Sequence, residues 1–264
     1  MKSACLALMV WLIAASVQAA GFDHGTWDGL LQRHVVAQGQ STQVDYTGMA
    51  RERARLKTYL DALAAVRSGE FDRWPRAERL AFLINAYNAW TVELVLTRYP
   101  DLRSIRELGG VFSSPWKKRF IPLLGQTRSL DDIEHGLIRA EGAYEEPRIH
   151  FAVNCASVGC PALRNEAYAG DRIDAQLEDA TRGFLADRSR NRFNPATRRL
   201  EMSKIFDWYR QDFERGWGGY TRLSQFFLRY ADVLADTEAA RQLLRAGEAR
   251  FTHLDYDWAL NARR

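Results

Sequence analysis

The chain has 264 residues, of which 47% are hydrophobic, 12% are aromatic and 27% are charged, and its formal net charge is +4. This much apolar material is enough for one sizeable core or two small ones, which excludes a disordered chain. Because lysine, arginine, aspartate and glutamate are interspersed along the sequence, the charge pattern predicts no nucleic-acid partner.

The first residues have the pattern of a secretory signal peptide. Lys2 precedes an apolar run from Ala4 to Val17, and small residues stand at the two positions that a signal peptidase reads. The run is shorter than the ~20 residues that span a bilayer, so we expect cleavage after Ala19 rather than an uncleaved anchor. The pattern predicts a signal peptide over 1–19, a periplasmic or secreted mature chain over 20–264, and no stable membrane span after cleavage.

The mature chain keeps two cysteines, Cys155 and Cys160, because Cys5 leaves with the signal peptide. An even number of cysteines in an oxidising compartment favours a disulfide, which this spacing allows if the chain turns back on itself. Two free thiols are the alternative. A zinc site is disfavoured, because the C-x4-C spacing differs from that of zinc knuckles and a second cysteine or histidine pair is missing. We therefore expect no metal and no cofactor.

The absence of internal repeats and low-complexity linkers predicts one domain. Helical spacing of apolar residues begins at Leu56 and continues to Val66. A longer helix is predicted over 76–98, ended by the approach to Pro100, and it is apolar on nearly every side, which indicates burial. The stretch "FIPLLGQTRSL" then predicts a hairpin that turns near Gly125.

The second half of the chain continues this mixture of helices and strands. Ser129 is predicted to begin a helix through "LDDIEHGLIRA", with Asp132 completing a capping box. The stretch "RIHFAVN" alternates with the period of a strand. Helices are then predicted around "DAQLEDATRGFLAD", "KIFDWYRQDFE" and "LSQFFLRYA", followed by a terminal strand "THLDYDWAL". This order predicts an α+β domain with several helices packed around a small, mostly antiparallel sheet.

Several polar residues fall on apolar helix faces, where a buried polar group is costly unless it is paired. Four of them are predicted to point inward, with His135 on the flank of its helix: Asn85, Asn88, Glu134 and Asp212. A satisfied core network explains each of them alone. Taken together and close to the cysteine segment, they predict a functional site.

His150 stands five residues before Cys155. If a strand continues through this stretch, the two residues lie roughly 16 Å apart on opposite faces and cannot form a nucleophile and base pair. Three alternatives remain. The chain bends sharply after Asn154, or Cys155 uses another base (His135 first, His253 next), or His150 works with a different partner.

Five motifs occur in the order found in proteins that carry the domain of unknown function 547, and on these motifs the chain resembles a bacterial, secreted member of that family: "ERLAFLINAYNAWTV", "SLDDIEHGLIR", "PRIHFAVNCASVGCPAL", "SKIFDWYRQDF" and "LDYDWALN". The resemblance covers Val44 to Asn261 and brings no established reaction with it. It implies that the following residues stand at motif positions of the family: Asn85, Tyr87, Asn88, Glu134, His135, His150, Cys155, Ser157, Cys160, Pro161, Asp207, Trp208, Asp212, Asp255, Tyr256, Asp257 and Trp258.

The layout also resembles, more distantly, the papain and transglutaminase-like fold. On that analogy "HFAVN" is the strand that carries the histidine, and "AFLINAYNAW" takes the place of the helix that carries the nucleophile. Those enzymes have a cysteine at the start of the helix, whereas this chain has Asn85 and its neighbours there. Their mechanism therefore does not transfer directly, and fold analogy alone does not establish a function.

The first function that we expect is a thiol-dependent enzyme for acyl transfer or amide hydrolysis. Cys155 is its nucleophile, and His150 or His135 is its base. Glu134 orients the histidine, and Asn85 or Asn88 donates a hydrogen bond to an oxyanion.

The alternative function is a non-catalytic binding module for a small molecule or a peptide, with a Cys155–Cys160 disulfide at the rim of its pocket. The residues expected to bind the ligand are Asn88, Ser157, Cys160, Asp212 and Tyr87. A third interpretation leaves the polar residues as core contacts without any site.

Overall fold

The structure is a computed structural model that describes residues 21–110 and 113–263, so the predicted signal peptide over 1–19, with Cys5, lies outside the described residues. The helices are α1 (Gly25–His34), α2 (Tyr46–Arg51), α3 (Arg53–Ala65), α4 (Ser68–Phe71), α5 (Arg76–Leu96), α6 (Leu130–Ile133), α7 (Ile173–Ala186), α8 (Ile205–Trp208), α9 (Arg210–Glu214), α10 (Leu223–Arg229), α11 (Ala231–Leu234) and α12 (Glu238–Arg245). The strands are β1 (Val35–Gln38), β2 (Ser41–Val44), β3 (Ile121–Leu123), β4 (Gln126–Arg128), β5 (Arg192–Asn194), β6 (Arg199–Met202) and β7 (Arg250–His253).

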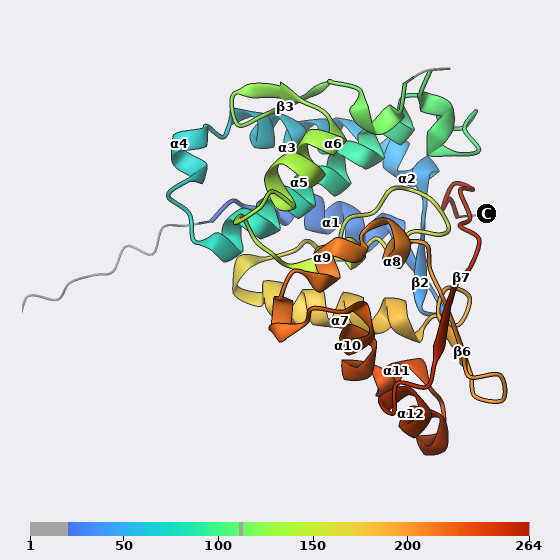
Figure 1. The fold of residues 1–264 in the computed structure, drawn as a ribbon. Helices are drawn as coiled ribbons and strands as arrows, with labels where there is room; N and C mark the ends of the chain where they lie inside the picture. Colours follow the sequence, from blue (N-terminus) through green and yellow to red (C-terminus); the bar gives the residue numbers. More distant parts are fainter. Residues whose placement is uncertain (1–20, 111–112, 264) are drawn as a thin grey trace, which may run out of the picture.

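Helix α5, which has 21 residues, is the centre of the larger of two hydrophobic cores. Every residue from Leu80 to Leu96 is buried, as the continuous apolar pattern predicted. Helices α3 and α6 pack against it (Figure 1). A helix that is covered on all sides has no solvent to hydrate its polar side chains, so each of them needs a partner within the protein.

Two asparagines of α5 find such partners in the backbone of distant segments. The side-chain amide of Asn85 donates to the carbonyl of Tyr168 at 2.7 Å and accepts from its N–H at 3.0 Å. Asn88 donates to the carbonyl of Ala152 at 2.9 Å and accepts from the N–H of Asn154 at 2.8 Å. Both amides therefore fasten loops onto α5, and Asn88 fixes the backbone just before the cysteine segment.

The second core lies in the C-terminal half, where α11 packs against α7 and α8 to α10 contribute buried side chains (Figure 1). Helix α7 contributes to both cores, because Leu177 packs in the first and Phe184 in the second. The 3-10 helix Pro147–Phe151 also contributes to both cores, with Ile149 in the first and Phe151 in the second. These two elements join the halves of the molecule.

The strands form three small sheets rather than the one sheet that was predicted. The pairs β1–β2, β3–β4 and β5–β6 are antiparallel, and β7 joins β6 in parallel. The β3–β4 hairpin turns at Gly125, where φ is 76°, as predicted. The α+β class with mostly antiparallel pairing is confirmed, and helices dominate the fold.

The predicted strand "RIHFAVN" is wrong. Its first residues belong to the 3-10 helix Pro147–Phe151, all five residues of which are buried. This segment is covered by a core on each side, so it has no solvent-exposed face for its polar residues. The alternation of apolar and polar residues therefore does not indicate a strand here. The histidine therefore lies on a helical turn, and the correspondence with a papain-like histidine strand finds no support in this element.

Other predicted elements are shorter than expected. The helix after Ser129 begins with the predicted capping box, in which Asp132 N–H donates to Ser129 Oγ at 3.0 Å and Ser129 N–H donates to Asp132 Oδ2 at 2.8 Å. It then widens into a π-helical turn, Glu134–Ile138. The helix predicted after Ser203 is divided into α8 and α9. The predicted terminal strand "THLDYDWAL" is mostly wrong, because β7 (Arg250–His253) shares only Thr252 and His253 with it.

The cysteine segment bends sharply after Asn154, since Ala156 has a φ of 61°. The final segment of the chain lies along it, with the N–H of Gly159 donating to the carbonyl of Asp257 at 2.8 Å. A Cβ atom on Gly159 would lie 3.0 Å from the Asp257 backbone. This close approach therefore favours glycine at position 159.

Candidate functional site

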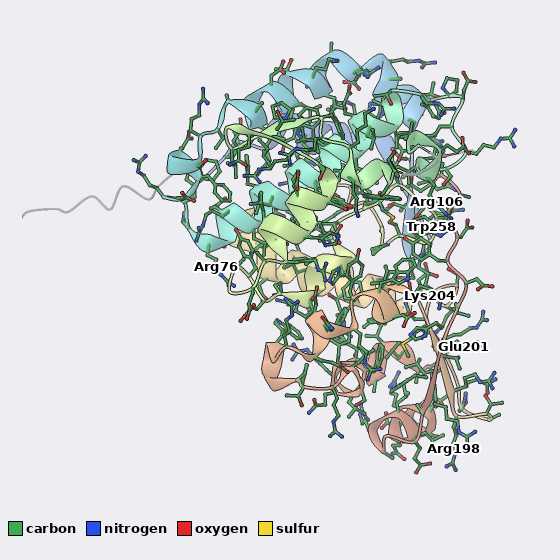
Figure 2. All side chains as sticks on the ribbon, turned by 45° about the horizontal axis from the view of Figure 1, so that its top comes forward. Arg76, Arg106, Arg198, Glu201, Lys204 and Trp258 are labelled. Carbon is green, nitrogen blue, oxygen red and sulfur yellow. A yellow bond between two sulfur atoms is a disulfide. The ribbon has the colours of Figure 1, made fainter. Side chains whose placement is uncertain are left out.

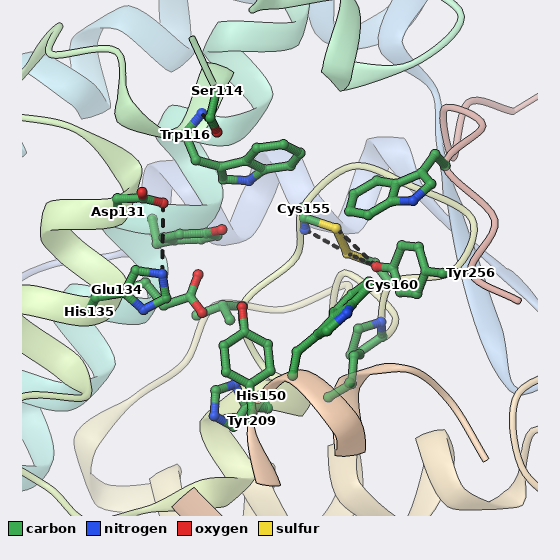
Figure 3. Close-up of a pocket in the computed structure, with 16 residues that line it drawn as sticks. Ser114, Trp116, Asp131, Glu134, His135, His150, Cys155, Cys160, Tyr209 and Tyr256 are labelled. Carbon is green, nitrogen blue, oxygen red and sulfur yellow. Dashed lines mark hydrogen bonds and ion pairs between the residues drawn. A yellow bond between two sulfur atoms is a disulfide. The ribbon is translucent and has the colours of Figure 1, made fainter. Parts of the chain in front are cut away.

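A cavity of about 280 Å³ lies where α5, α6, α8 and the cysteine segment meet the C-terminal segment (Figure 3). Its lining is Tyr87, Ser114, Trp116, Asp131, Glu134, His135, His150, Val153, Cys155, Cys160, Pro161, Ile205, Trp208, Tyr209, Tyr256 and Trp258. These residues come from segments that are far apart in the sequence, and both halves of the molecule contribute to the cavity.

One wall of the cavity is acidic. Asp131 lies in α6, and Glu134 begins the π-helical turn that follows it, where the N–H of Arg139 donates to the carbonyl of Glu134 at 2.8 Å. Glu134 is only 5% exposed, which confirms the prediction that it points inward, and Figure 3 shows its carboxylate directed into the cavity. Its Oε1 atom is shielded from water and has no hydrogen-bond partner among the described residues.

The negative charge of Glu134 affects its neighbours. Burial raises the pKa of Tyr87 and of Tyr209 well above the ordinary value, and the charge of Glu134 raises both further, so both hydroxyls stay protonated. Burial also raises the pKa of Asp131, with a smaller contribution from Glu134, whereas His135 opposes the rise. The wall therefore concentrates negative charge in a place where it is poorly solvated.

The floor of the cavity contains a paired histidine. His150 Nε2 lies 2.7 Å from Asp212 Oδ2, and the imidazole stacks on the Tyr209 ring at 3.9 Å between centroids. Burial alone would raise the pKa of Asp212, but the hydrogen bonds from His150 and Arg139 outweigh it and hold that pKa well below its usual range. Burial lowers the pKa of His150 from its usual 6.5, although the bond to Asp212 opposes this.

These directions determine the tautomer of His150. An ionised Asp212 only accepts hydrogen bonds, so the proton of the neutral imidazole is on Nε2 and Nδ1 is an acceptor. Nδ1 is shielded from water and has no partner among the described residues. His150 therefore has the arrangement of an oriented base, with its free nitrogen beneath the Tyr209 ring.

The wall opposite Glu134 contains a disulfide. The sulfurs of Cys155 and Cys160 are 2.09 Å apart, so the pair is bonded. The Tyr256 hydroxyl lies 3.2 Å from Cys155 Sγ and 3.3 Å from Cys160 Sγ. A bridged sulfur is not a thiolate, and Cys155 has no nucleophile to offer in this state.

Aromatic rings complete the cavity. The rings of Trp208 and Trp258 lie 4.9 and 4.5 Å from the Tyr256 ring, and Trp116 lies 5.9 Å from Trp258. Arg106 places its guanidinium 5.3 Å from the Trp258 ring centre, and Figure 2 shows the two side chains next to each other. The rings thus support one another around the space opposite the acidic wall.

The structure brings six of the predicted site residues to the cavity: Tyr87, Glu134, His135, His150, Cys155 and Cys160. The other four lie behind it. Asp212 orients His150, and Ser157 Oγ lies 3.2 Å from the Tyr256 hydroxyl. Asn85 and Asn88 hold backbone segments, so the expectation that Asn85 or Asn88 donates to an oxyanion is wrong, because the polar side-chain atoms of both are already used.

Sequence reasoning missed the part that aromatic residues play in the site: Trp116, Trp208, Tyr209, Tyr256 and Trp258 line the cavity. An aromatic side chain at an apolar position is expected in a core and does not stand out. A carboxylate at such a position does stand out. The usable signal was the repeated pairing of aspartate with aromatic residues in "FDWY" and "LDYDW".

The fold and the cavity define an α+β protein with an acidic and aromatic ligand-sized pocket that is framed by a disulfide. Residues 71–185 match the model of the family described as "Protein of unknown function, DUF547", and this match supports the assignment of the chain to that family. The matched segment includes the acidic wall, His150 and the disulfide, whereas Trp208, Tyr209, Tyr256 and Trp258 follow it in the sequence. The comparisons found no match among curated proteins and none among solved structures.

Within residues 21–110 and 113–263, side chains of histidine, cysteine, aspartate and glutamate do not gather in threes or more at a distance that suits a metal ion. The helices in the same part of the chain are too short or too polar to cross a membrane.

Proposed function

We propose that this protein is a binding module, periplasmic or secreted, whose cavity holds a small organic cation. The observation that carries the proposal is the composition of the lining. The described residues around the cavity include two carboxylates, Asp131 and Glu134, and six aromatic rings, but neither lysine nor arginine.

The acidic wall favours a positively charged ligand. A carboxylate that is removed from water is stable only when a cation or several hydrogen-bond donors compensate its charge. Glu134 is 95% buried (5% exposed), and its Oε1 has no partner among the described residues. His135, a basic side chain of the cavity lining, has its Nε2 at 3.8 Å from Asp131 Oδ1, outside hydrogen-bonding distance.

The aromatic wall favours the same kind of ligand. The face of a tryptophan or tyrosine ring attracts a cation by about 0.5–2 kcal/mol, depending on desolvation. Figure 3 shows Tyr256 across the cavity from Glu134, and the rings of Trp208 and Trp258 lie next to Tyr256. A cation between the two walls contacts rings on one side and carboxylate oxygen on the other. A volume of about 280 Å³ suits a ligand of small-molecule size rather than a folded partner.

The location of the protein is part of the proposal. The pattern of residues 1–19 is that of a cleaved signal peptide, and the Cys155–Cys160 disulfide is a bond that persists in oxidising compartments. Fractionation of the source cell, with N-terminal sequencing of the mature chain, tests this part. A mature protein in the cytoplasm that retains Lys2 would contradict it.

Calorimetric titration of the disulfide-bonded mature protein with benzylammonium and with the neutral benzyl alcohol tests the binding function. The cation is expected to bind at least about tenfold more tightly than the alcohol, which corresponds to about 1.4 kcal/mol. Equal affinities, or no binding of either compound, would overturn the proposal.

A thiol-dependent acyl-transfer or amide-hydrolysing activity is the second candidate, and one observation favours it. Cys155 and the oriented base His150 line the same cavity, although they do not lie on one continuous strand. This activity requires a dithiol reductant to open the disulfide first. Alkylation followed by intact-mass measurement tests that requirement: we expect no label on Cys155 or Cys160 without reduction and two labels after it. Labelling of the unreduced protein would contradict the bridge and return Cys155 to the role of nucleophile.

A further inference from the structure

We infer that the cation held by the cavity is a primary ammonium or a guanidinium ion that donates N–H hydrogen bonds to Glu134 and Asp131, and not a quaternary ammonium ion. This inference rests on the proposed function, because it specifies the head group of the ligand in the same cavity.

Glu134 has an unused acceptor atom in the cavity wall. An ionised carboxylate accepts hydrogen bonds at about four positions, and a buried carboxylate is stable only when these are filled. Glu134 is 5% exposed, it points into the cavity, and its Oε1 has no partner among the described residues. The ligand group that pairs with this carboxylate must therefore be a hydrogen-bond donor.

Asp131 lies three residues before Glu134 and therefore on the same side of the helix. Its carboxylate also lines the cavity. The ion pair that it forms within the described residues, with His135 Nε2 at 3.8 Å, is too long for a hydrogen bond. One wall thus presents two carboxylates with free acceptor positions, and a head group with several N–H donors can serve both.

The acidic wall distinguishes cations that carry N–H groups from methylated cations. Aromatic rings alone recognise both kinds, because the attraction depends on charge. The acceptors on the opposite wall distinguish them. Three methyl groups on nitrogen would exclude water from Glu134 without supplying a donor, and this leaves the carboxylate desolvated and unpaired. The three donors of an ammonium ion, or the planar fork of a guanidinium ion, fill these positions.

Calorimetric titration of the mature, disulfide-bonded protein with four benzyl compounds tests the inference. The probes are benzylammonium, benzylguanidinium, benzyltrimethylammonium and the neutral benzyl alcohol, each up to about 10 mM. We expect the two N–H cations to bind at least about tenfold more tightly than the trimethylated cation. If the trimethylated cation binds as tightly as the N–H cations, and all bind more tightly than the alcohol, the inference fails while the cation site stands. If the alcohol matches the cations, or if no probe binds, the proposed function fails with it.

Variants of the acidic wall test whether its carboxylates cause the preference for N–H cations over the trimethylated cation. Glu134→Gln keeps the shape of the side chain and removes its charge, and we expect it to reduce the preference for benzylammonium over benzyltrimethylammonium to less than about threefold. Asp131→Asn is the second test, because it changes a partly exposed carboxylate in the same wall. The matched control is Glu93→Gln, a buried carboxylate outside the cavity that Arg53 pairs at 2.7 Å. An unchanged preference in both wall variants, or its loss in Glu93→Gln, would overturn the inference.

Discussion

Asn88 of α5 and Glu134 of the cavity wall are both buried polar side chains on helix faces that the sequence predicts to be apolar, and they differ in their contacts. Asn88 donates to Ala152 and accepts from Asn154, so its hydrogen-bonding capacity serves the backbone of another segment. Glu134 is equally shielded, yet its Oε1 is without a partner among the described residues. Unfilled hydrogen-bonding capacity, rather than burial, therefore separates a structural polar residue from one that awaits a ligand.

The largest effect is expected on the structural side of the comparison. Asn88→Leu leaves the carbonyl of Ala152 and the N–H of Asn154 buried without partners, and each such group costs about 1–3 kcal/mol. We expect the free energy of unfolding, measured by urea denaturation, to fall by about 3 kcal/mol. A loss below about 1 kcal/mol would mean that Asn88 is not the clamp that its contacts indicate.

Glu134→Gln should behave in the opposite way. Glu134 Oε1 has no partner among the described residues, so removing the charge relieves desolvation without breaking a hydrogen bond at that atom. We therefore expect the free energy of unfolding to stay within about 1 kcal/mol of the parent value or to rise. The affinity for benzylammonium should fall by at least about tenfold. A marked loss of stability, without a change in affinity, would place Glu134 in the same structural category as Asn88.

The pH dependence of stability sharpens the comparison at His150. Its pKa is lower in the folded state than the ordinary 6.5, so the unfolded chain binds more protons as the pH falls. The stabilising contribution is present above about pH 6.5 and is lost as the pH decreases towards the folded-state value, by at most about 1.4 kcal/mol per pH unit.

The variant His150→Gln, which retains a donor for Asp212, should unfold with a shallower pH dependence between about pH 7 and 5. His24 acts in the same direction, because burial lowers its pKa to about 4, and its contribution remains in the variant. Superimposable pH profiles for the parent and the variant would show that His150 does not titrate as its burial requires.

The smallest effect is expected at Trp208, which is 47% exposed and lines the cavity. Trp208→Ala should weaken benzylammonium binding about fivefold, through the loss of about 1 kcal/mol of cation–ring attraction, and should change the free energy of unfolding little. Phe251→Ala is the matched control, since Phe251 is 43% exposed and contacts Phe227 rather than the cavity. Equal losses of affinity in both variants would contradict a specific contact with Trp208.

Prediction from the sequence succeeded for elements that are buried along one face, or on all sides, over many residues. The burial of α5, the turn at Gly125, the capping box of Ser129 and the inward direction of Glu134 are all confirmed. Each of these follows from local pattern or local chemistry, which one sequence contains in full.

The parts that the sequence did not predict depend on contacts between distant segments. His150 lies on a 3-10 helix because cores on both sides cover Pro147–Phe151, and no residue period reveals a second core. Tyr256 and Trp258 of the aromatic wall lie more than a hundred positions after Glu134 in the sequence. The C-terminal segment brings them to the cavity when the chain folds. Such proximity is a property of the packed chain and not of any one stretch.

The C-terminal segment also decides when the cavity can exist during synthesis. The hydroxyl of Tyr46 donates to Asn261 Oδ1 across 215 positions of sequence, and the N–H of Leu260 donates to the carbonyl of Arg103 at 2.7 Å. At a translation rate of about 5–20 residues per second, Asn261 is made roughly 6–25 s after Glu134. A nascent chain therefore contains all of α5 and the acidic wall for many seconds before the rings that complete the cavity have left the ribosome.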